Sequence, residues 1–103
     1  MTRGTTPTFC FALPFEVSTL SGWCISFAQR GVEKFSVEED DAGASVEGRV
    51  ISLTLRQSDT LRLEAGVDVQ IQLRGLVAAT GEAIASEILT AAVEPVLREG
   101  VLA

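Results

Sequence analysis

The side chains of this chain with reactive chemistry are two cysteines, scattered serines and one run of carboxylates. Its 103 residues include no histidine, which excludes the Ser–His and Cys–His pairs in which an imidazole activates the nucleophile. No serine lies in a G-x-S-x-G or S-x-x-K motif, and the sequence has no glycine-rich phosphate loop. Two cysteines without histidine also argue against a zinc site. We therefore predict no catalytic residue, no metal ligand and no cofactor.

Four consecutive acidic residues, Glu38 to Asp41, offer the type of oxygen ligand that Ca²⁺ prefers. The run lacks the alternating spacing and the central glycine of an EF-hand loop. Adjacent carboxylates in a loop also repel one another. We interpret the run as an exposed, solvated loop.

The two cysteines allow two interpretations. If strands 8–13 and 20–29 pair symmetrically about Val17, Cys10 faces Cys24 and the two thiols come within reach of a disulfide. The alternative is a pair of small, half-buried free thiols, the state that a reducing cell interior maintains. The sequence leaves both open.

A polar stripe follows the most regular strand of the chain. Residues 67–74 alternate strictly between apolar and polar side chains, which places every second side chain on the same face of a sheet. Gln70, Gln72 and Arg74 therefore share the wet face. They form either an ordinary solvated surface or a subunit contact, in which the arginine binds a partner's carboxylate through two hydrogen bonds.

The last β-like stretch has little protection against pairing with a strand of another molecule. Soluble proteins protect strand edges with charges, lysines or prolines, yet Ala83–Ala92 carries a single charge, Glu87. We hypothesise that the Ala83–Val96 strand, at Glu87 and Ile88, or the polar stripe beside it, contacts another subunit.

Short strands separated by turn residues organise the whole chain as one domain, residues 1–103, with residues 1–6 frayed. For residues 82–96 the pattern allows a helix, but we favour a strand because the segment follows a hairpin-like turn. The fold class is all-β, an immunoglobulin-like two-sheet antiparallel β-sandwich, with a small β-barrel as the alternative. The expected core is Phe11, Trp23, Ile25, Phe27, Leu53, Val69, Ile71 and Leu73.

Composition limits the classes of partner that fit this chain. Hydrophobic residues make up 47% of the chain, which argues against disorder. The net charge is −6, with seven arginines and one lysine, so a phosphate backbone or an anionic membrane is a poor match. No apolar run reaches the roughly 18–20 residues that span a bilayer. We interpret residues 9–15 as a strand and not as a signal peptide.

The chain resembles a family of small uncharacterised proteins encoded by tailed phages and prophages of gut bacteria. The resemblance covers nearly the whole sequence. The first half of the stretch 53–86 is also similar to immunoglobulin-like modules of phage baseplate proteins. Where family members carry a turn with two adjacent glutamates, this chain has Ser58-Asp59, so no carboxylate pair is carried over. The matching segments are Thr6–Thr8, Leu13–Phe15, Ile25–Gln29, Gln57–Leu61, Val69–Arg74, Gly81, Ala85–Ile88, Val96–Leu97 and Gly100–Val101.

The resemblance implies a non-enzymatic structural or accessory protein of a phage or prophage. Such a protein would lie in the host cytoplasm during assembly, or in the virion, and would bind other phage structural subunits or itself. A carbohydrate-binding or host-surface adhesion module is the alternative. It would need exposed aromatic side chains, so an exposed Trp23 would favour it.

Overall fold

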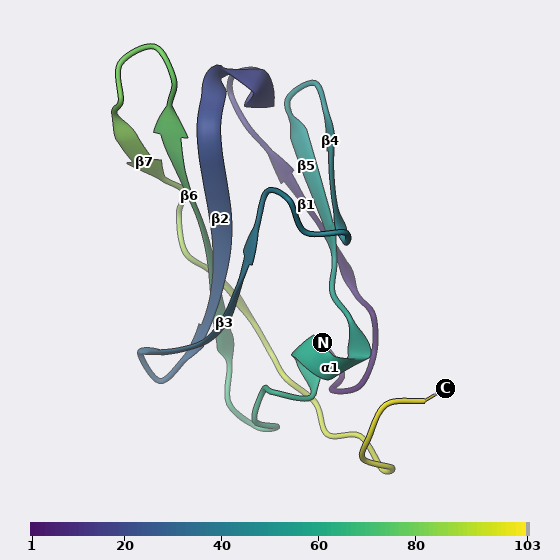
Figure 1. The fold of residues 1–103 in the computed structure, drawn as a ribbon. Coiled ribbons are helices and arrows are strands. Elements are labelled where there is room, and N and C mark those ends of the chain that lie inside the picture. The colour runs from purple at the N-terminus through teal and green to yellow at the C-terminus, as the bar shows by residue number, and fades with distance from the viewer. Residues whose placement is uncertain (103) are drawn as a thin grey trace.

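Two antiparallel sheets pack face to face in the computed structural model, which describes residues 1–102 (Figure 1). The three-stranded sheet has the order β1 (Thr8–Ala12), β5 (Val50–Thr54), β4 (Ala44–Glu47). The five-stranded sheet has the order β3 (Val32–Glu38), β2 (Leu20–Gln29), β6 (Val69–Val77), and both β7 (Ala83–Ala85) and β8 (Leu89–Ala91) pair with β6. The predicted all-β sandwich is confirmed, and nothing within residues 1–102 closes the sheets into a barrel.

The core lies between the inner faces of the two sheets. All eight residues expected in the core are buried. Phe27 of β2 joins the layers: its ring centroid lies 4.6 Å from that of Phe35 on β3 and 6.1 Å from that of Phe9 on β1. Because Phe9 belongs to the other sheet, this aromatic cluster contributes to holding the sheets together.

The expected pairing of the first two strands is wrong, and with it the expected juxtaposition of the cysteines. β1 pairs with β5 in the smaller sheet, where Cys10 stands opposite Ser52. Cys24 lies on β2 in the larger sheet, opposite Arg74, and both cysteines are free thiols. The cause is the connection: the 3₁₀ helix η1 (Val17–Thr19), anchored by buried Val17, carries the chain from one sheet to the other instead of forming a hairpin.

The ambiguous segment 82–96 forms strands, as we favoured. β7 and β8 are both antiparallel to β6. Ser86 between them donates its amide to the Leu73 carbonyl (2.8 Å), and its Oγ accepts the Leu73 amide (3.0 Å). The register with β6 shifts by one residue between β7 and β8, so the strand is interrupted by a bulge.

Glycine turns set the two short hairpins. Arg30 and Gly31 have φ values of 53° and 77°, the two left-handed residues that a tight β2–β3 turn requires. Gly48, with a φ of 60°, forms the turn of the β4–β5 hairpin. Val46 lies on the edge strand β4 and is 49% exposed.

The two ends of the chain meet beside the short helix α1 (Gln57–Thr60) (Figure 1). Thr2 forms a parallel bridge with Glu94. The expected fraying of residues 1–6 concerns motion and stays a prediction. In the part of the chain that is described, no helix is long and apolar enough to cross a membrane.

Candidate functional site

The polar stripe lies in the middle of the outer face of the larger sheet. β6 is flanked by β2 on one side and by β7 and β8 on the other. Its odd-numbered apolar residues from Val69 to Leu73 are buried, whereas Gln70 and Arg74 are exposed and Gln72 is half-buried. The alternation of the strand therefore places the three predicted polar residues on one solvent-facing surface.

The bulge brings the segment that carries the other two predicted residues next to the polar stripe. Gln72 donates its side-chain amide to the Ser86 carbonyl (3.1 Å), which ties the bulge to the polar stripe. Glu87 follows directly, is exposed and also lines a hollow beside Cys10 of β1. Ile88 is 56% exposed. Thus the structure unites two stretches that are far apart in the sequence. We call this surface the docking face and define it as Gln70, Gln72, Arg74, Glu87 and Ile88.

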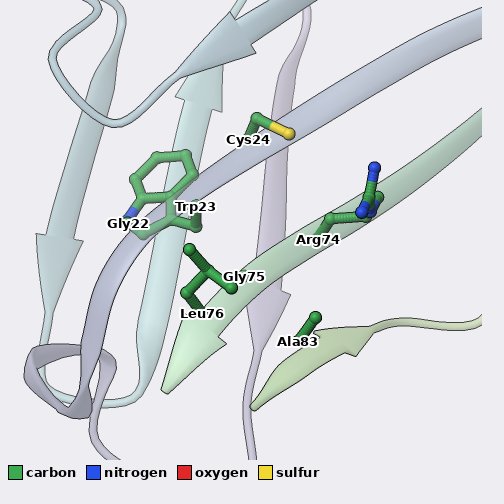
Figure 2. Close-up of a pocket in the computed structure, with 7 residues that line it drawn as sticks. All are labelled: Gly22, Trp23, Cys24, Arg74, Gly75, Leu76 and Ala83. Atoms are coloured by element: carbon green, nitrogen blue, oxygen red, sulfur yellow. The ribbon is translucent and has the colours of Figure 1, made fainter. Parts of the chain in front are cut away.

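A hollow of about 290 Å³ adjoins the docking face at Arg74 (Figure 2). Cys24 and Arg74 stand side by side on neighbouring strands. Leu76 also lines the hollow. The hollow is open because two of its outward positions, Gly22 and Ala83, have little or no side chain. Sequence reasoning missed this hollow. The small residues at alternating positions 22, 24, 26 and 28 of β2 indicate a strand face with little side-chain cover, but not which strand lies beside it.

Charges of both signs border the hollow. Arg74 forms no ion pair with any residue from 1 to 102, so its guanidinium is available to an outside carboxylate. On the far side, a methyl group added to Gly22 would lie 3.3 Å from a carboxylate oxygen of Glu39. The hollow therefore has the cationic Arg74 in its lining and the anionic Glu39 near its opposite border at Gly22.

The acidic loop shows no arrangement for a cation. One Asp41 carboxylate oxygen accepts the Gly43 amide (2.8 Å) and also an Arg56 guanidinium hydrogen (3.0 Å). Across residues 1–102 no three histidine, cysteine or acidic side chains are grouped closely enough to hold a metal ion. Asp41 thus serves to shape the turn before β4.

No protein-family model, no curated protein and no solved structure matches this chain.

Proposed function

We propose that this chain is a non-enzymatic structural or accessory protein of a phage or prophage, whose docking face binds another protein subunit during assembly. The assembly setting rests on the sequence resemblance. Docking rests on one observation: a guanidinium free of internal ion pairs and an exposed isoleucine converge on a surface held by a central strand and its bulge.

The side chains of the docking face define a partner chemistry. Arginine binds carboxylates in a bidentate geometry, with direction as well as attraction. Leu76, two residues after Arg74 on β6, is 49% exposed, and Ile88 is 56% exposed. Burying such apolar surface against a partner is favourable. The fitting partner is a protein surface that presents an aspartate or glutamate next to apolar side chains.

Carbohydrate binding or adhesion draws no comparable support. Stacking on sugar rings needs an exposed aromatic face, yet Trp23 is 7% exposed. The phenylalanines are buried or half-buried too, so residues 1–102 present no exposed aromatic side chain.

The test is a binding assay against the products of the neighbouring genes, with two charge-reversal variants. Arg74→Glu removes the cation from the docking face, whereas Arg62→Glu makes the same charge change at another exposed arginine. We expect Arg74→Glu to weaken binding by about tenfold or more, because the partner's carboxylate is then repelled instead of attracted. Arg62→Glu should leave binding unchanged. Ile88→Lys should weaken binding independently of that charge pair.

Two results would contradict the proposal. Full binding by both Arg74→Glu and Ile88→Lys would place the contact elsewhere. Failure of every neighbouring product to bind, together with absence of the protein from purified particles, would remove the assembly role.

A further inference from the structure

The outer side of β1 is an unpaired strand edge in the smaller sheet. The Pro7 carbonyl oxygen and the Leu13 amide nitrogen, which flank β1, are bonded to the chain that carries β5, at 3.0 and 2.8 Å. Backbone groups alternate in direction along an antiparallel strand. Thr8, Cys10 and Ala12 therefore point their N–H and C=O groups away from β5, and no strand of residues 1–102 pairs with that side.

The other edges of the sandwich carry protection that β1 lacks. β3 contains Glu33, Lys34 and Glu38, and β4 ends in Glu47. The β7–β8 edge is broken by the bulge at Ser86. Charges and bulges are the devices that prevent edge pairing. β1 has no charge, no internal proline and an unbroken register with β5, so it is the edge most open to a further strand.

The sequence of β1 is nearly symmetric about its centre. It reads Thr-Phe-Cys-Phe-Ala, with Cys10 in the middle. If two copies pair antiparallel about this residue, Cys10 faces Cys10 and Thr8 faces Ala12. All of these are residues whose backbone groups point outward, so the three facing pairs exchange about six hydrogen bonds. A surface that complements itself in this way meets the requirement of a two-fold dimer.

The seam beneath this edge is mainly apolar. Hollows of about 310 and 270 Å³ lie between β1 and the β7–β8 edge. Ser86 and Glu87 contribute polar groups to their lining, and the apolar lining includes Leu13, Phe15, Leu73, Ile84 and Leu89. Removing apolar surface from water lowers the free energy, and a second copy joined at β1 would cover the mouth of the seam.

We propose that this chain forms a two-fold homodimer by pairing β1 with β1 of a second copy, with Cys10 on the two-fold axis. The two smaller sheets then become one continuous sheet. This edge lies on the smaller sheet and the polar stripe on the larger one. Glu87 and Leu89 line the hollow beside Cys10, so the dimer and a contact at Glu87 share this border of the sandwich, whereas Arg74 lies away from it.

Disulfide trapping tests the register. In the dimer the two Cys10 Cα atoms lie about 5.5 Å apart, inside the range that a disulfide bridges. In a Cys24→Ser background, diamide should join the two Cys10 thiols, accepting the two electrons and two protons that they lose. With both cysteines replaced by serine, Thr8→Cys combined with Ala12→Cys should also crosslink. Thr8→Cys alone should not, because the two equivalent Cα atoms then lie about 14 Å apart.

Light scattering across a concentration series tests the dimer in solution. We expect a concentration-dependent dimer whose dissociation constant rises about tenfold or more in Cys10→Lys, because two like charges meet at the axis. High salt should partly restore it. Ser45→Lys, on β4 at the other edge of the same sheet and also exposed, is the control and should dimerise normally. A monomer at every concentration, or a dimer that Cys10 cannot crosslink, would overturn the proposal.

Discussion

At the scale of single residues, Gln29 shows what a pattern of alternation leaves out. It occupies the position after Trp23, Ile25 and Phe27 on the inner face of β2 and is 1% exposed. Its amide nitrogen donates to the Glu64 and Val67 carbonyls, both at 2.9 Å, and its carbonyl oxygen accepts the Glu64 amide at 2.8 Å. A glutamine at the end of an apolar face thus fixes a loop far along the chain, and no local pattern announces that partner.

Replacing Gln29 with methionine should destabilise the fold. Methionine has a similar length but cannot pair with the three backbone groups of the loop, and each unpaired group that is shielded from water costs free energy. We expect the free energy of unfolding to fall by about 2–4 kcal/mol in urea melts. Gln70→Met, on the exposed face of β6, is the matched control and should change it by less than about 0.5 kcal/mol. Equal effects of the two substitutions would contradict the role of Gln29.

The cysteines also show that a local pattern predicts the direction of a side chain but not its partner. The sequence correctly places Cys10 and Cys24 away from the core faces of their strands, because side-chain direction depends only on the local period of two. Their partners depend on which strands are neighbours. The turn at η1 sends β1 to β5, so the predicted pair lies on different sheets.

At the scale of elements, the docking face divides into a part that the sequence predicts and a part that it does not. Gln70, Gln72 and Arg74 were predictable because they lie on one regular strand. Weak edge protection in the sequence indicates Glu87 and Ile88, and the hydrogen bond from Gln72 to the Ser86 carbonyl holds the bulge that carries them against β6. The hollow at Gly22 was not predictable, because it exists only once β2 and β6 are known to be neighbours.

The inner face of β6 supports a second stability prediction. Ile71 is 1% exposed and stands opposite Phe27 in the register with β2. Ile71→Ala removes buried methyl groups and leaves a cavity, so we expect a loss of about 2–5 kcal/mol. Gln70→Ala, the adjacent residue on the outer face, should cost less than about 1 kcal/mol. Denaturant melts in which Ile71→Ala also loses less than about 1 kcal/mol would mean that the assignment of the strand faces is wrong.

At the scale of the whole molecule, the sandwich presents two kinds of surface on different sheets. The larger sheet offers side chains on its outer face, with Arg74 free of internal ion pairs among residues 1–102. The smaller sheet offers backbone groups along β1. Side-chain recognition depends on the partner's sequence, whereas strand pairing depends mainly on its backbone. The two proposed contacts therefore use different chemical groups of one small domain: the side chain of Arg74 for another protein and the backbone of β1 for a second copy.

The ends of the chain add a contact that sequence analysis did not foresee. Glu94 donates its amide to the Met1 carbonyl at 2.8 Å, and the Arg3 amide donates to the Glu94 carbonyl at 3.1 Å. The Arg3 side chain donates to the Leu61 carbonyl at 2.9 Å and pairs with Glu99. Arg3 therefore connects the first segment of the chain to the last and to the loop after α1.

Arg3→Ala should loosen this junction. The guanidinium is largely covered, with its side chain 18% exposed, so its hydrogen bonds are less weakened by water than those of a surface arginine. We expect a loss of about 1–2 kcal/mol in the free energy of unfolding and faster hydrogen exchange at the Glu94 amide, which the junction protects. Arg98→Ala, at an exposed position near the same end, should change neither. If the Glu94 amide of the unaltered protein already exchanges as fast as an unprotected amide, the first residues are frayed, as the sequence predicts, and the junction does not hold in solution.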